Sequence, residues 1–371
     1  MNRISEAARL MDRFARSSGL IGDRPAHRYL WTDAHAVCNY LALAAATGDD
    51  TYTRLAVTLV DQVHEVLGRH RGDDGRSGWI SGLADSDGRK HPTAGGLRIG
   101  KPLPERRRDE PSDPRAEWDQ DGQYYHYLTK WMHALLQVAA ATGERRYLVW
   151  ARKLAMAAYR GFRAPSGRAR LFWKMSIDLS YPLVPSSGLH DPLDGLVTAL
   201  TLRTGAEDEG VLEPIIAGLS AMCRGQSWVT DDPLGIGGLL FDAGRLAQLP
   251  PGVPGDVDPD LLATVLADAE RGLESFSRSS DLAQPAAYRL AFRELGLSIG
   301  LQVPELIEPY DLPQPARAVV ARLLNRRKLG ISIERFWSVP RTHESATWTD
   351  HQDINTVMLA TSLVPDGMLV L

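Results

Sequence analysis

Cysteine is scarce in this sequence, and long uncharged apolar runs are missing. The two cysteines, Cys38 and Cys223, lie in apolar stretches of helical character, where small buried thiols are common, and two thiols make no disulfide framework. No segment approaches the ~20 apolar residues that a membrane span needs. Residues 1–20 also lack the unbroken apolar core of a secretory signal. We therefore expect a cytoplasmic protein with no membrane partner.

A basic stripe is missing as well. The 42 Lys and Arg are outnumbered by 46 Asp and Glu, and the one basic cluster, at 106–108, is surrounded by acids. This argues against nucleic acid as the main partner. The cysteines carry no metal-binding motif, so neither a metal nor another cofactor is expected. The oligomeric state is left open.

What the sequence does contain is a repeat. Residues 41–67 and 135–159 both run small apolar residues into Ala-Thr-Gly, then a charged pair, then a second helical stretch that begins near a Tyr. A degraded copy covers residues 196–223. A repeated unit of helix, Gly stop and helix predicts stacked helical hairpins. With 44% hydrophobic and 24% charged residues, the chain can bury one large core.

The helices fall into two kinds. Some are apolar around most of their circumference and are predicted to be inner helices, whereas others carry a one-sided apolar stripe and are predicted to be outer helices. This favours an all-α fold, an (α/α)6 toroid or six-hairpin barrel that forms a single domain over residues 1–371. Inner helices are expected at 124–141, 234–248, 281–301 and 346–363, and outer helices at 258–276 and 315–327. The last outer helix is not evident, and the helix at 3–17 is expected beside the C-terminal inner helix.

One connection is far longer than two helices need. Residues 69–117 are rich in Gly, Arg, Asp and Pro, and a loop of this length is usually a lid or the wall of a site. We expect it to fold over the mouth of a central cavity. Residues 170–184 have the character of short β-strands.

Polar residues follow one face of the second inner helix. They recur at spacings of four and three residues, which places them on one helix face: Asp119, Gln123, His126, Lys130, His133 and Gln137. The rest of this helix is apolar and aromatic, so the polar face is expected to line a wet cavity.

Three inner helices start with an aromatic residue followed by an acid. The starts are Trp31-Thr32-Asp33, Trp118-Asp119 and Trp348-Thr349-Asp350. Each alone is explained by helix capping, but three at one rim favour a site. The acids expected at this rim are Glu117, Asp119, Asp121, Asp191, Asp194, Glu344, Asp350 and Asp353.

These inner-helix starts, with the turns Thr47-Gly48-Asp49 and Thr142-Gly143-Glu144, resemble the six-hairpin glycosidase superfamily. The resemblance implies a carbohydrate-active enzyme that acts on a small-molecule or oligosaccharide substrate. Cleavage of a glycosidic bond requires two opposed carboxyl groups, and the resemblance places them at Asp119 or Asp121 and at Asp350 or Asp353. Side chains predicted to contact the substrate are Trp31, His35, Trp79, Arg98, Trp118, Gln123, His126, Lys130, His190, Asp194, Tyr288, Trp348 and His351.

Two alternatives stay open. Sugar epimerases of the N-acylglucosamine 2-epimerase type resemble the same toroid but move a proton with histidines, here His126 and His351, and a neutral His is a competent base. The other alternative is a toroid without catalytic activity that binds a glycan, a peptide or a protein, because a fold does not determine a function.

Overall fold

The computed structural model describes residues 2–165, 169–203, 209–250 and 257–371. The chain divides into two compact units: unit 1 comprises residues 1–17, 42–48 and 224–371, and unit 2 comprises residues 18–41 and 49–223. The expectation of one continuous barrel domain stays a prediction. The Thr-Gly turn of the degraded third repeat, at 204–205, lies outside the described residues.

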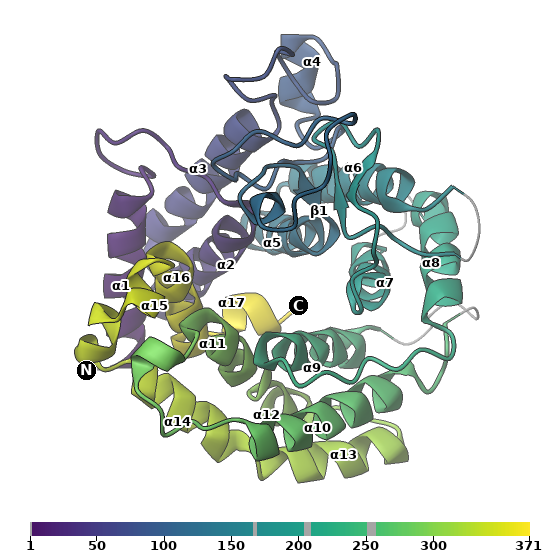
Figure 1. Cartoon of the computed structure of the whole chain (residues 1–371). Helices are drawn as coiled ribbons and strands as arrows, with labels where there is room; N and C mark the ends of the chain where they lie inside the picture. Colours follow the sequence, from purple (N-terminus) through teal and green to yellow (C-terminus); the bar gives the residue numbers. More distant parts are fainter. Residues whose placement is uncertain (1, 166–168, 204–208, 251–256) are drawn as a thin grey trace. The chain divides into compact units, whose positions relative to one another are not determined.

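Unit 2 holds the first hairpins and a small sheet. Helix α5 packs against α6 and α7, and α7 packs against α8 (Figure 1). The strands form an antiparallel sheet in the order β1-β2-β3. The elements are α2 (Leu30–Thr47, which enters unit 1 at residue 42), α3 (Asp50–Leu67), α4 (Asp85–Lys90), η1 (Ala116–Trp118), β1 (Gln123–Tyr124), α5 (Tyr125–Thr142), α6 (Arg145–Phe162), β2 (Lys174–Met175), β3 (Pro182–Val184), α7 (Asp191–Leu202) and α8 (Glu209–Cys223).

The repeated Thr-Gly turns end their helices as predicted. Gly143 takes the left-handed conformation, with φ 72°, and its N–H donates to the carbonyl of Ala139, which ends α5. Gly48 has φ 71° in the first repeat. A residue without Cβ adopts this conformation without strain, so both hairpins turn in the same way. Beyond the turn, α6 buries only one face, which includes Tyr147 and Leu154.

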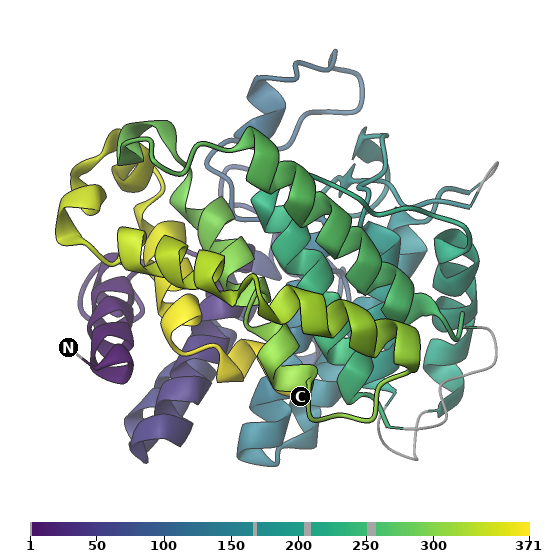
Figure 2. The ribbon, with the colours of Figure 1, turned by 90° about the horizontal axis from the view of Figure 1, so that it is seen from below.

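The described residues of unit 1 form helices joined by loops and contain no strand. Helix α9 packs closely on α11, because a Cβ on Gly237 would lie 2.1 Å from the carbonyl oxygen of Gly296. Helix α10 lies between α9 and α13 (Figure 2), and α1 packs on α16, as predicted. The elements are α1 (Arg3–Ser17), α9 (Pro233–Gln248), α10 (Leu261–Ser279), η2 (Ala286–Tyr288), α11 (Ala291–Gly300), α12 (Val303–Ile307), α13 (Gln314–Leu324), α14 (Arg327–Trp337), η3 (Pro340–Glu344), α15 (Ala346–Thr349), α16 (Gln352–Leu363) and α17 (Asp366–Leu369).

Several predicted helix boundaries are wrong. The inner helix at 281–301 is only α11, at 291–300, and the one at 346–363 is broken between α15 and α16. The outer stretch at 315–327 ends early as α13, and a further helix, α14, follows it at 327–337, where the sequence predicted none.

The start of the second inner helix is also misplaced. Helix α5 begins at Tyr125, so Asp119 and Gln123 precede it. Gly122 has φ 145°, which favours glycine, and Gln123 then pairs with Met175 of β2. Because the chain is committed to a strand there, the helix does not extend further back.

Candidate active site

His126 lies in the first turn of α5 among aromatic rings. Its imidazole is nearly parallel to the indole of Trp173, with ring centroids 6.4 Å apart, and it meets Tyr127 edge-on at 4.9 Å. Tyr124 lies 5.3 Å away. The His126 side chain is 31% exposed, and its Nδ1 lies 3.5 Å from Oδ1 of Asp191. The structure therefore places an accessible imidazole between aromatic faces and a carboxylate.

A second basic residue lies one turn further along α5. Lys130 Nζ lies 2.7 Å from Oδ2 of Asp194, and the Thr129 hydroxyl donates to the same oxygen at 2.5 Å. His126 and Lys130 are four residues apart on α5, whereas Asp191 and Asp194 are three apart in the first turn of α7. Both spacings bring side chains to one helix face, so the two helices meet through two matched acid–base pairs.

The polar face continues along α5 beyond these pairs. His133 is buried, and its Nε2 lies 3.4 Å from the Gln137 amide nitrogen. That this face lines a central cavity stays a prediction.

An exposed tryptophan borders the aromatic cluster. Trp118, at the end of η1, is 57% exposed, and its indole meets Trp173 edge-on at 5.8 Å. Asp119 follows it and is exposed as well. The predicted pair Trp118-Asp119 therefore lies at the end of η1, ahead of α5, and Trp118 reaches the cluster through Trp173.

Asp121 is engaged with its neighbours on both carboxylate oxygens. The side chain has no exposed surface. Its Oδ1 accepts from the backbone N–H of Gly100, Lys101 and Gly122 at 3.0, 3.3 and 3.1 Å, and its Oδ2 lies 2.5 Å from Arg98 Nη1. Asp121 thus ties the 69–117 segment to β1.

Gln123 makes a similar tie. Its Oε1 accepts from the N–H of Leu97, and its Nε2 donates to the carbonyls of Gly95 and Ile177. With both ends of the amide occupied and the side chain fully buried, Gln123 holds chain segments together in this structure and presents no group to a ligand.

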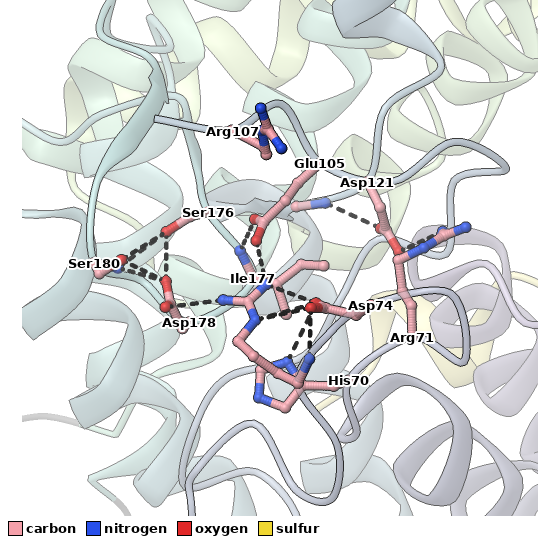
Figure 3. Close-up of polar contacts among 12 residues, drawn as sticks. His70, Arg71, Asp74, Glu105, Arg107, Asp121, Ser176, Ile177, Asp178 and Ser180 are labelled. Atoms are coloured by element: carbon pink, nitrogen blue, oxygen red, sulfur yellow. Dashed lines mark hydrogen bonds and ion pairs between the residues drawn. The ribbon is translucent and has the colours of Figure 1, made fainter. Parts of the chain in front are cut away.

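An ion cluster fastens the 69–117 segment to the β2–β3 hairpin (Figure 3). The guanidinium of Arg76 contacts the carboxylates of Asp74, Glu105 and Asp178, and Glu105 accepts from the N–H of Ile177 at 2.5 Å. The bonds to Asp74 raise the pKa of Arg76, whereas burial raises the pKa of Glu105. The long segment is therefore a well-bonded part of unit 2.

The two remaining predicted residues of this segment have structural partners. Arg98 donates to the carbonyls of Val66 and Arg69 as well as to Asp121. Trp79 donates to Asp85 and lines a groove of about 450 Å³ between α3, α4 and α6. These partners lie outside α5 and α7. That the segment covers a cavity mouth stays a prediction.

Trp31 and His35 are buried at the start of α2. His35 Nδ1 donates to the carbonyl of Trp31 at 2.9 Å, and the two rings lie 4.1 Å apart. Burial lowers the pKa of His35 to about 4, so this imidazole is neutral near pH 7. It is a packed neutral group.

The predicted residues of unit 1 differ in exposure. Tyr288 is 77% exposed, whereas Trp348 is 1% exposed and stacks on His343 at 3.7 Å. A ring so enclosed leaves no face for a sugar, which corrects the prediction for Trp348. His351 is exposed and meets Phe292 edge-on at 5.6 Å.

The two acids predicted in unit 1 flank a helix break. Asp350 follows the short helix α15 and is exposed, and Asp353 lies in the first turn of α16, where its Oδ1 accepts from the Ser17 hydroxyl at 2.9 Å. Of these two carboxylates, Asp350 is the more accessible.

Sequence reasoning missed Trp173 and the pairing of Asp191 with His126. Asp191 was expected as a rim acid only. Asp191 and Asp194 are three residues apart and His126 and Lys130 are four apart, and both spacings place side chains on one helix face. Trp173 gave no signal, because it reaches His126 through the pairing of β2 with β1. His190, which was predicted, occupies the N-cap of α7 next to Asp191.

Metal sites and membrane spans were sought over the described ranges. Within them, no three or more His, Cys, Asp or Glu side chains form a group that could hold a metal ion. No described helix is both long and apolar enough to cross a membrane.

No protein-family model and no curated protein matches the sequence. Solved structures do match the fold. The GH76A alpha-1,6-mannanase from Salegentibacter sp. HEL1_6 is 13% identical over 97% of this chain and 98% of that chain, with a TM-score of 0.55. An inactive variant of that mannanase in complex with alpha-1,6-mannotriose is 12% identical over 98% of this chain and 99% of that chain, with a TM-score of 0.56.

A sugar epimerase from a ruminal bacterium is 11% identical over 97% of this chain and 98% of that chain, with a TM-score of 0.54. The chain shares its fold with this mannanase and this sugar epimerase. This confirms the predicted all-α, (α/α)6 fold class. At this level of identity the likeness establishes the fold, and the function has to be argued from the site.

Proposed function

We propose that the chain is a carbohydrate-active enzyme in which His126 transfers protons. The observation that supports this most directly is the setting of the imidazole, which is accessible and flanked by Trp173 and Tyr127. Imidazole is the side chain that most often serves as general acid or base, and aromatic faces present an apolar surface to the C–H groups of a sugar. The likeness to a mannanase and to a sugar epimerase supports the same class.

The reaction that best fits a histidine centre is epimerisation of a reducing sugar. A base takes the proton from the carbon next to the carbonyl, and a proton returned to the opposite face gives the epimer. Water is not consumed and the chain length is unchanged. In this proposal His126 handles one proton and His351, the partner predicted from the sequence, handles the other.

The second candidate is hydrolysis of a glycosidic bond by two carboxyl groups. Asp121 and Asp353 already accept hydrogen bonds, so Asp119 and Asp350 are the better members of the two predicted pairs. The specific observation in favour is the exposed indole of Trp118 beside Asp119, together with the likeness to a mannanase.

Product analysis separates these candidates. We would incubate the protein with mannose, glucose, cellobiose and alpha-1,6-mannobiose, and follow both sugar identity and new reducing ends. Epimerisation gives an isomer of unchanged chain length and is abolished by His126→Gln. Hydrolysis gives monosaccharides from the disaccharides and is abolished by Asp119→Asn. Binding without turnover would mean a silent toroid and would contradict the proposal.

A matched control for these variants is Gly238→Ala on α9. A Cβ at Gly238 meets no atom within 4 Å, so the variant controls for handling and expression without disturbing the packing of α9. Full epimerisation by His126→Gln, with Gly238→Ala equally active, would exclude His126 as the proton-transfer group.

A further inference from the structure

Asp191 has a feature that its place in α7 does not explain. The side chain is only 4% exposed, and its Oδ2 has no hydrogen-bond partner among the described residues. His126 Nδ1, which faces the same carboxylate at 3.5 Å, is also buried and also lacks a hydrogen bond within the described chain. Buried polar atoms are nearly always satisfied, and exceptions gather where a site acts.

We propose that Asp191 is a positioning residue that fixes the tautomer of His126, an inference that rests on the proposed function of that histidine. The carboxylate keeps the proton on Nδ1 and leaves the lone pair on Nε2, which becomes the nitrogen that exchanges protons with a bound sugar. A neutral imidazole has one donor and one acceptor nitrogen, and the partner of one nitrogen sets the role of the other.

The burial of the ring agrees with this assignment. Nδ1 is enclosed although about a third of the His126 side chain is exposed, so the exposed part of the ring is its other edge. The other rings around His126 come from Tyr124, Tyr127 and Trp173 and carry no charge near neutral pH. Lys130 is engaged by Asp194. Asp191 is therefore the charged group that acts on Nδ1 directly.

The turn before α7 is built around this carboxylate. A Cβ on Gly188 would lie 2.4 Å from Oδ2 of Asp191 and 2.8 Å from Oδ1, so only glycine leaves room for the carboxylate. Pro192 follows at the start of the helix, where its fixed φ suits the first helical turn. The distance of 3.5 Å is long for a hydrogen bond, and such bonds commonly tighten when the substrate arrives.

The test is the tautomer itself, read from the ¹⁵N shifts of the His126 ring in full-length protein at about pH 8.5, where an ordinary histidine is neutral. The signals are assigned by their loss in His126→Gln. We expect a protonated Nδ1 and an unprotonated Nε2 in the wild-type protein. Asp191→Asn should shift His126 toward the opposite tautomer, because its amide can donate to Nδ1.

A second variant keeps the charge and moves the carboxylate. Gly188→Ala places a methyl group against Asp191, and the backbone conformation at Gly188 suits alanine. Gly188→Ala should also weaken the preference of His126 for a protonated Nδ1. This variant replaces Asp191→Asn in the test if Asp191→Asn does not fold. The control is Asp268→Asn on α10, which removes a buried carboxylate that accepts from Trp228 N–H at 2.6 Å and should leave the His126 signals unchanged.

Two results would overturn the inference: a wild-type His126 protonated at Nε2, or a tautomer unchanged in both Asp191→Asn and Gly188→Ala. Kinetics give a separate readout, in which Asp191→Asn lowers kcat on the order of 100-fold, as loss of acid–base assistance does, with little change in KM. If the His126 tautomer shifts in Asp191→Asn but the wild-type protein turns over no sugar, the positioning by Asp191 is upheld and the proposed function is refuted. Failure of the inference and failure of the proposed function are therefore distinguishable.

Discussion

Replacing Asp121 by Asn tests whether this carboxylate holds the site together. The carboxylate is fully buried and accepts from three backbone N–H groups and from Arg98. Asparagine keeps the shape but has one acceptor oxygen and one NH₂ group. Whichever way the amide turns, its NH₂ faces a donor, either the backbone N–H groups or the guanidinium.

The expected loss of stability follows from this geometry. Removing one partner of a buried ion pair costs about 3–5 kcal/mol. Arg98 retains two backbone carbonyls, and Arg71, which also contacts Asp121, retains Asp73, so we expect about 3 kcal/mol. The exposed Asp119 gives a matched comparison, because Asp119→Asn should change the free energy of unfolding by less than about 0.5 kcal/mol.

Urea unfolding measures this difference. Tryptophan fluorescence and far-ultraviolet circular dichroism should be followed together, because coincident transitions are required before one free energy is assigned. If Asp121→Asn unfolds within about 0.5 kcal/mol of the wild-type protein, the structural role given to Asp121 is wrong. Loss of sugar turnover without loss of stability would indicate that Asp121 has a catalytic role.

Three further outcomes are expected. Burial lowers the pKa of His64 to about 3, below about 6.5 in the unfolded chain, so the unfolded state binds the proton first on acidification. His64 therefore contributes about 2 kcal/mol of lost stability between pH 6.5 and 4.5, and the stability gap between the wild-type protein and His64→Gln should narrow over that range. Trp118→Ala should weaken sugar binding by about tenfold in titration calorimetry, since an aromatic contact contributes about 0.5–1.5 kcal/mol. The melting temperature of this variant should be unchanged. Unchanged sugar binding would show that Trp118 is not part of the site. Gly237→Ala should destabilise the protein by about 1–3 kcal/mol, because the added methyl group meets the Gly296 carbonyl. Gly238→Ala, in contrast, should stabilise the protein by up to about 1 kcal/mol. Equal melting temperatures of the two variants would contradict the close packing of α9 on α11.

The sequence predicted those parts of the fold that depend on local pattern. The turns at Gly48 and Gly143 are local, because a glycine stop between two amphipathic stretches defines a hairpin without distant contacts. The inner and outer character of α5 and α6 was likewise visible in the distribution of apolar residues. These signals were sufficient for the fold class.

The errors arose where distant segments decide the local structure. Gln123 was assigned to a helix, yet it pairs with Met175, about 50 residues later in the chain, and its helical spacing gave no hint of this. Trp173 reaches His126 through the same pairing. The partnership of Asp191 with His126 depends on how α7 packs on α5, which spacing suggests only after both helices are known to be neighbours.

The most direct test of the account is solvent isotope exchange at a sugar carbon. The wild-type protein and His126→Gln would be incubated in D₂O with reducing monosaccharides and disaccharides, and deuterium at the carbon next to the carbonyl would be measured by NMR. We predict incorporation by the wild-type protein and none above background by His126→Gln at equal thermal stability. Wild-type exchange rates in His126→Gln, or no exchange by the wild-type protein on any sugar, would contradict proton transfer at His126.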